Sequence, residues 1–267
     1  MCQYSSRLVL LLTILVAPLS QADARPNADW SPAVIDSVVY AGETTIIEVS
    51  MELTRSAENL SLWVVPELRP YVSISPTGIA DVAAGEQILF ELQISVDDAA
   101  EPQRVDGTVH LRSGKETIAR PLPVSLDLQW PSIAGPGGVV VTYPGTVYAE
   151  TSAESDAVLL WDKSAPPSIP ESDDVGFISI GFLSNPSGEQ IEQVFDGAPG
   201  DDLGDFQGTI EVDGRTGFEY RPVATLGGDR VVIVPIANGF VQFSEIASSF
   251  DSEGPFDQVL EAAELPD

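Results

Sequence analysis

Cysteine, histidine and lysine are scarce in this sequence, and the first two shortages exclude a class of structure or chemistry. Cys2 is the only cysteine among 267 residues, so no disulfide within the chain supports the fold. His110 is the only histidine, which excludes metal sites built from several histidines. Stability therefore has to come from buried cores and backbone pairing, and 43% hydrophobic residues supply enough apolar material for them.

Basic residues are also scarce as a group. The chain has 12 lysine and arginine residues against 41 acidic ones, and only Lys115 and Lys163 are lysines. The formal charge of −29 repels phosphate backbones and anionic lipid headgroups, so we expect neither nucleic-acid binding nor direct binding to anionic membranes. Solubility in a salty medium explains such a charge more simply than a specific cation-binding role does.

Residues 1–24 have the pattern of a secretory signal peptide. Arg7 is the only charge before an apolar run over residues 8–19, and small residues then precede a cleavage site that we place after Ala24. A membrane anchor, the alternative, needs about 20 apolar residues, and this run is shorter and interrupted by Pro18. We therefore expect an extracytoplasmic protein, periplasmic or secreted, whose single cysteine leaves with the signal peptide.

A segment rich in proline and glycine, residues 130–138, divides the rest of the chain. The residue patterns differ on its two sides, which predicts a linker between one domain over residues 29–129 and another over residues 139–267.

The first of these domains is predicted to be a β-sandwich. Apolar and polar residues alternate along most of its segments, as in strands with one buried face, and turn residues separate them without any helical stretch. Short strands at this spacing are typical of two packed sheets. The predicted strands cover residues 34–40, 44–53, 60–65, 71–74, 88–96, 105–112 and 122–128.

Four short motifs of this domain resemble bacterial extracellular immunoglobulin-like modules. They are Val72–Pro76, Ala84-Gly85-Glu86, Asp106–Arg112 and Pro121–Val124. In those modules an Ala-Gly-Glu turn precedes a long strand, and two further strands complete the sandwich. The resemblance implies an immunoglobulin-like fold without the disulfide of antibody domains, and it implies no particular activity.

The second domain mixes strand and helix patterns. A helix is predicted over residues 187–195, where Ser187 can cap the first turn, and a second amphipathic helix over residues 256–263. Together with the strands this predicts an α+β domain built on a mostly antiparallel sheet. The predicted strands cover residues 139–143, 157–161, 175–182, 208–212, 217–220, 230–236 and 239–243.

Parts of the second domain resemble a small α+β domain of exported bacterial proteins, similar to the PsbP-like class. The matching residues are the Tyr143-Pro144 pair, the Val234–Gly239 strand and turn, and the closing Phe256–Leu260 helix. The chain departs from that class after Pro144, where Gly145 follows in place of the usual tryptophan. The resemblance implies no site residues.

His110 is the first candidate for chemistry. A histidine can act as a general base or bind a metal, but His110 has no second histidine and no cysteine at ligand spacing. We therefore favour an exposed strand residue beside Arg112, on the face opposite Val109 and Leu111. The sequence also lacks a His-Glu-x-x-His helix and a Gly-x-Ser-x-Gly elbow, so we assign no catalytic residue.

Acidic residues provide two further candidates. A glycosidase needs two carboxylates about 5 to 10 Å apart, but a chain with this many acids contains such pairs inevitably. The loop Asp196–Asp205 offers several carboxylates among glycines and is the best candidate for Ca²⁺. Its spacing does not match an EF-hand, and solvated turns have the same composition, so we assign no metal ligands.

The aromatic residues and one proline-rich segment complete the search. Trp30, Trp63, Trp130 and Trp161 are predicted to pack in the core or between domains rather than to form a carbohydrate-binding platform. Residues 164–174 are predicted to be a stiff connector, with a partner-docking segment as the alternative.

These observations favour an exported interaction or accessory protein of the bacterial cell envelope or extracellular space. The balance favours a protein without enzyme activity but leaves that question open, and we expect no cofactor and a protein or glycan partner that the sequence does not identify. Two alternatives stay open. One is an extracellular hydrolase or carbohydrate-active protein with an accessory sandwich, and the other is a calcium-dependent adhesion protein.

Overall fold

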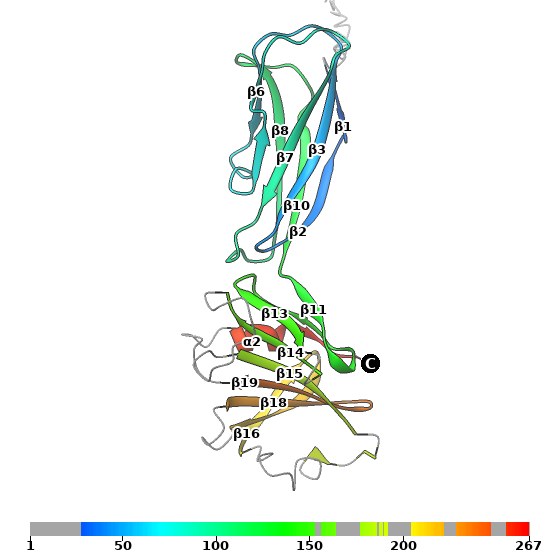
Figure 1. Cartoon of the computed structure of the whole chain (residues 1–267), viewed down its shortest axis with the longest axis vertical. Coiled ribbons are helices and arrows are strands. Elements are labelled where there is room, and N and C mark those ends of the chain that lie inside the picture. The colour runs from blue at the N-terminus through cyan, green and yellow to red at the C-terminus, as the bar shows by residue number, and fades with distance from the viewer. Residues whose placement is uncertain are drawn as a thin grey trace, which may run out of the picture.

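A computed structural model describes residues 28–152, 156–163, 177–185, 187–188, 190–191, 204–221, 228–246 and 255–266. The fold is mainly β, as predicted, and the described residues contain four sheets and one α-helix. Residues 28–129 form two of the sheets, and the other two use strands between residues 132 and 264. The two parts lie end to end along the long axis of the molecule (Figure 1).

The N-terminal part is a sandwich of a smaller and a larger sheet. The smaller sheet has the strand order β1-β3-β7-β5, and the larger has β2-β10-β8-β4-β6 with β9 paired to β8. The order β1-β3-β7-β5 opposite β10-β8-β4 is that of immunoglobulin sandwiches. The strands are β1 (Ala28–Ser31), β2 (Ile35–Tyr40), β3 (Thr44–Leu53), β4 (Leu60–Val64), β5 (Val72–Ser75), β6 (Gly78–Ile79), β7 (Gln87–Ser95), β8 (Gln103–Ser113), β9 (Glu116–Thr117) and β10 (Leu122–Gln129).

Period-two alternation places the core between these sheets. In β7 the side chains from Ile88 to Ile94 alternate between buried and exposed, and in β8 Val109 and Leu111 are completely buried. Burying one such side chain contributes about 1.5–3 kcal/mol, so the alternation supplies most of the driving force for this part. Edge strand β2 runs parallel to β10, a pairing that alternation alone does not predict.

The C-terminal part, residues 132–266, contains a seven-stranded antiparallel sheet with the order β13-β14-β15-β19-β18-β17-β16. A three-stranded sheet, β11-β12-β20, lies beside it. The elements are β11 (Ser132–Ala134), the 3₁₀ helix η1 (Pro136–Gly138), β12 (Val140–Thr142), β13 (Val147–Ser152), β14 (Ala157–Asp162), β15 (Phe177–Ser184), β16 (Asp205–Val212), β17 (Arg215–Arg221), β18 (Gly228–Ile236), β19 (Gly239–Ile246), α2 (Pro255–Glu261) and β20 (Ala263–Glu264).

Several expectations for this part need correction. The predicted helix over residues 256–263 ends at Glu261, and Ala263 begins β20. Residues 132–134 of the predicted linker form β11, which pairs with β12, and β13 was not predicted at all. Of the other predicted helix, residues 187–195, only Ile191 is described as helical, and most of the segment lies outside the described residues.

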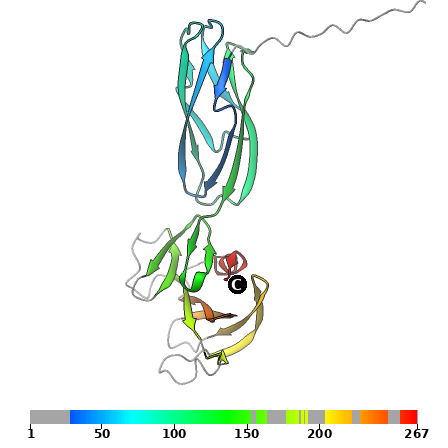
Figure 2. The same cartoon turned by 90° about the vertical axis from the view of Figure 1, so that its right-hand side faces the viewer.

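Both faces of the seven-stranded sheet are covered by apolar side chains. Helix α2 buries Phe256, Val259 and Leu260 in one core cluster together with β18 and β19. Tyr220 and Ile233 belong to a second cluster on the other face. Figure 2 shows α2 lying against the curved sheet. Because strand neighbours such as Val232 and Ile233 point to opposite faces, the continuous apolar run of β18 supplies both clusters.

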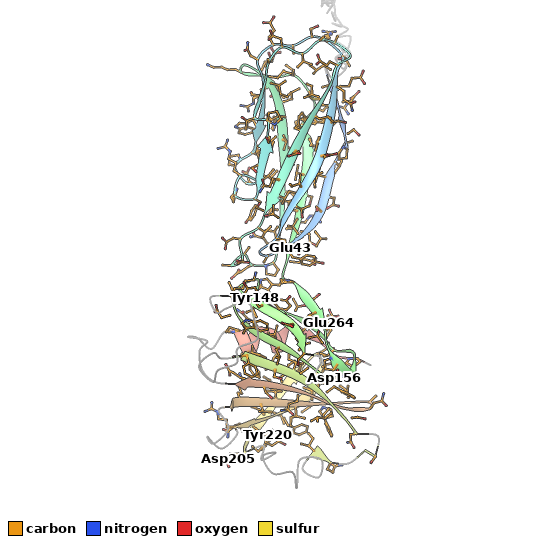
Figure 3. The ribbon with its side chains drawn as sticks, in the orientation of Figure 1. Glu43, Tyr148, Asp156, Asp205, Tyr220 and Glu264 are labelled. Carbon is orange, nitrogen blue, oxygen red and sulfur yellow. The ribbon has the colours of Figure 1, made fainter. Side chains whose placement is uncertain are left out.

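The two parts meet in a close contact. Lys163 Nζ lies 2.6 Å from Asp98 Oδ1, and a Cβ atom added to Gly145 would lie 2.5 Å from the Cβ of Ala41. Glu43 and Tyr148 mark the two sides of this junction in Figure 3. A side chain at position 145 would therefore push the parts away from each other.

Candidate functional site

The outer face of the larger sheet carries a cluster of aromatic and basic side chains. It comprises Trp63, Arg69, His110 and Arg112, which we call the Trp63 cluster. Antiparallel pairing of β4 with β8 sets Trp63 opposite His110, while the neighbouring pair, Leu62 and Leu111, faces the core. The cluster thus lies on the solvent side of two central strands.

Within the cluster three groups contact one indole ring. The His110 ring meets Trp63 edge to face, with ring centroids 5.3 Å apart at 63°. The guanidinium carbon of Arg112 lies 4.3 Å from the centroid of the Trp63 ring, and that of Arg69 lies 5.3 Å from it. Cation–π contacts of this kind contribute about 0.5–1 kcal/mol each near the surface, so both arginines are held in place before any ligand arrives.

A short turn places Arg69 beside the indole. The N–H groups of Leu68, Arg69 and Tyr71 donate to carbonyls three residues earlier, which winds this segment tightly. The fully buried Leu68 fixes the turn, because its side chain fills the space left by the missing side chain of Gly107. Arg69 Nε then donates to the carbonyl of Val64, 3.1 Å away.

His110 is half-buried rather than exposed, which corrects the prediction for this residue. Val109 and Leu111 do face the core as predicted. Burial lowers the pKa of His110 below its ordinary value, and the charge of Arg112 lowers it further, so both effects favour the neutral ring. Its Nε2 lies 3.0 Å from Thr108 Oγ1.

No ion pair among the described residues neutralises the positive charges of the cluster. Neither Arg69 nor Arg112 has a carboxylate oxygen within 4.0 Å among the described residues. By contrast, Arg104, which lies on β8 like Arg112, pairs with Asp36 and Asp106. Arg112 Nε is buried and has no hydrogen-bond partner there. A buried donor without a partner is rare enough in folded proteins to require an explanation.

A pocket on the smaller sheet is the second candidate. It has a volume of about 330 Å³ and is lined by Glu48, Ser75, Pro76, Leu89, Phe90 and Glu91. Glu48 and Glu91 lie directly opposite each other on β3 and β7. Two carboxylates on one wall could serve general acid and base chemistry. Only the pairing of β3 with β7 distinguishes these two carboxylates from the many other acidic pairs that the sequence contains.

The tryptophans divide into two groups. Trp161 is buried, Trp130 packs against the sandwich core with its Nε1 donating to the carbonyl of Ala100, and Trp30 packs edge to face on Phe90. These three confirm the predicted packing role. The prediction was wrong for Trp63, which lies on the outer face.

Other predicted features lie outside the described residues. These are the signal peptide, the proline-rich segment over residues 164–174 and, except for Gly204 and Asp205, the calcium candidate loop. No group of three or more potential metal ligands occurs in the part of the chain that the structure describes. The same part contains no helix that is long and apolar enough to span a membrane.

No protein-family model and no curated protein matches the chain. It is distantly similar to a family 123 glycoside hydrolase from Clostridium perfringens, with 10% identity and a TM-score of 0.30, over 38% of this chain and 27% of that one. A protein of unknown function from Porphyromonas gingivalis matches with 12% identity and a TM-score of 0.31, over 83% of each chain. The CsuC–CsuE chaperone–adhesion subunit complex from Acinetobacter baumannii matches with 12% identity and a TM-score of 0.28, over 51% of this chain and 76% of that one. The chain thus spans about a quarter of the hydrolase, and these distant β-rich neighbours assign it no family.

Proposed function

We propose that this chain is an exported, non-enzymatic interaction protein of the bacterial cell envelope or extracellular space, and that it binds its partner through the Trp63 cluster. One observation carries the proposal. Two arginines that have no carboxylate partner among the described residues lie on an outward-facing tryptophan in a chain with a net charge of −29. Tryptophan and arginine are the residues that most often dominate protein interfaces.

The form of the site favours binding over catalysis. Thr108 lies within hydrogen-bond distance of His110, as a nucleophile and its base would, but no carboxylate in the described residues pairs with the ring to orient it. The cluster lies on the outer face of a sheet, whereas sites for small substrates are concave. A protein surface is the more suitable partner for such a face.

Capture from envelope extracts tests this proposal. The tagged, exported chain and its Trp63→Ala variant are each used to retain proteins, which are identified by mass spectrometry and then purified for direct binding. We expect the variant to lose the partner while staying folded, because Trp63 lies outside the core and its two cation–π contacts are worth only about 0.5–1 kcal/mol each. Tyr40→Ala is the matched control, since Tyr40 is an exposed aromatic residue on edge strand β2. Retention of the same partners by Trp63→Ala would contradict the proposal.

The pocket at Glu48 and Glu91 supports a second candidate function, an extracellular hydrolase acting on glycans. Screening of the purified chain on glycans and esters tests it. Saturable turnover that Glu48→Gln or Glu91→Gln abolishes would establish the hydrolase and displace our first proposal.

A further inference from the structure

Resting on the proposed function, we infer that the Trp63 cluster recognises carboxylate groups and that its partner is a protein segment rich in aspartate and glutamate. The inference depends on which donors of the two arginines stay unused, on the charges around them and on the shape of the surface.

The guanidinium groups have donors left for a ligand. Arg69 uses its Nε for the carbonyl of Val64, and no contact of its terminal nitrogens with a carboxylate occurs among the described residues. Arg112 has a buried Nε without a partner. A guanidinium that lies on an aromatic ring still presents its N–H groups at its edge, and their fork matches the two oxygens of a carboxylate. Because the buried Nε of Arg112 is out of a ligand's reach, the terminal N–H groups of both arginines are the donors that a bound carboxylate would use.

The charge distribution points to the same ligand. With 41 acidic residues in the chain, a neutralising carboxylate beside Arg112 would be easy to supply from within, as it is for Arg104 on the same strand. The cluster instead keeps its positive charge. A long polyanion such as nucleic acid is disfavoured because the net charge of −29 repels it. A short acidic segment can bind, because physiological salt screens the repulsion from acidic residues of this chain that lie more than about 8 Å away.

The geometry favours a protein segment over an acidic sugar. A sugar ring binds an indole by stacking on its face, and Arg112 already lies over the Trp63 ring at 4.3 Å. An open sheet face also lacks the concave walls that hold a small ligand. An extended segment needs neither feature, because alternate side chains along it can reach Arg69 and Arg112 while it lies across β4 and β8.

His110 supplies a readout of occupancy. The charged group that acts on it is Arg112 on its own strand, and Arg69 lies 5.3 Å from the centroid of the Trp63 ring that His110 contacts. Strand β4 contributes no ionisable side chain, and neither do Pro121 and the first two residues of β10, Leu122 and Pro123. A carboxylate bound at the arginines favours the protonated imidazole, so the pKa of His110 rises on binding and affinity increases as the pH falls.

The test uses a short peptide of alternating aspartate and serine, with its asparagine–serine counterpart as the control ligand. The resonances of His110 are followed by NMR in the full chain, where a single histidine makes the assignment direct. We expect the acidic peptide to raise the pKa of His110 by about 1 unit, as a nearby opposite charge does. The asparagine peptide should leave that pKa unchanged.

Variants separate the charge from the fold. Arg112→Met should weaken peptide binding about tenfold or more, and Arg112→Lys should give an intermediate loss because it keeps the charge without the planar fork. Arg104→Met removes a charge from the same strand that is already neutralised, and it should bind like the wild type. If Arg112→Met fails to fold, Arg69→Met, whose arginine lies on an exposed turn, provides the same comparison.

Three results would overturn the inference. One is equal binding of the acidic peptide and the asparagine peptide, and another is binding that Arg112→Met and Arg69→Met leave unchanged. The third is binding of a uronic or sialic acid oligosaccharide, or of inorganic phosphate, in place of the peptide. In each case a partner captured through Trp63 would still support the proposed function, so failure of the inference and failure of that function are distinguishable.

Discussion

Arg112 in the sandwich and Arg230 in the C-terminal part both lie over an aromatic ring, but carboxylates neutralise only Arg230. The guanidinium carbon of Arg230 lies 5.1 Å from the ring centroid of Phe256, and the group pairs with Glu219 at 2.8 Å and Asp257 at 2.5 Å. Arg112 lies 4.3 Å from the ring of Trp63 without any such partner in the described residues.

The difference teaches how the chain uses the same pair of groups in two ways. Burial acts to lower the pKa of Arg230, but its hydrogen bonds to Asp257 and Glu219 outweigh this and raise it. Arg230 thereby ties α2 to β17 and β18, which is a structural role. Arg112 joins no elements through an ion pair in the part of the chain that the structure describes, and we propose that its charge serves a partner instead.

Removal of each arginine charge gives the largest expected contrast in stability. Arg230→Met leaves Glu219 partly buried without its partner and should lower the free energy of unfolding by about 2 kcal/mol. Arg112→Met removes no ion pair among the described residues and loses one cation–π contact, so it should lower the free energy of unfolding by no more than about 1 kcal/mol. Urea unfolding followed by circular dichroism measures both. A larger loss for Arg112→Met than for Arg230→Met would reverse the comparison.

Displacement of Arg69 should have the next largest effect, on both stability and partner binding. A Cβ atom on Gly107 would lie 2.6 Å from Leu68 Cγ, so Gly107→Ala should displace the turn that holds Arg69. Overpacking of this kind costs about 1–3 kcal/mol, and we also expect weaker partner binding. Gly78→Ala is the control, because the nearest atom to a Cβ there is 3.8 Å away. Unchanged binding by a folded Gly107→Ala variant would show that Arg69 needs no exact placement.

The sequence predicts the fold around these arginines better than it predicts the Trp63 cluster. Alternation identifies β7 and β8 because one face of each is buried. The cluster requires the pairing of β4 with β8, which alternation does not predict. It also requires the turn between β4 and β5 that places Arg69 beside the indole. The size and apolar character of Trp63 predict a place in the core, but Leu62 beside it takes the inward position. A glycine inside a strand, Gly107, was the overlooked signal of a close approach.

Lys163 has one carboxylate partner and so lies between Arg112 and Arg230 in how far its charge is neutralised. Its removal should have a smaller effect on the free energy of unfolding. It lies 5.9 Å from the ring centroid of Tyr148 and pairs with one carboxylate, Asp98, across the junction. Because Asp98 is half exposed, Lys163→Met should lower the free energy of unfolding by no more than about 0.5 kcal/mol, and added salt should remove the difference. Unfolding at two salt concentrations checks this, and a large loss that salt does not affect would contradict it.

The smallest effect concerns the pH dependence that Arg112 imposes on His110. The pKa of His110 in the folded chain is lowered from 6.5, by burial first and by Arg112 second, so the unfolded state binds more protons between the two values. The free energy of unfolding therefore rises as the pH increases through that interval, and His110→Gln should abolish this part of the rise. Arg112→Met should diminish it without abolishing it, because burial remains. NMR titration of His110 in the wild type and in Arg112→Met measures the difference in its pKa. An unchanged pKa in Arg112→Met would mean that the charge of Arg112 does not affect the ionisation of the imidazole.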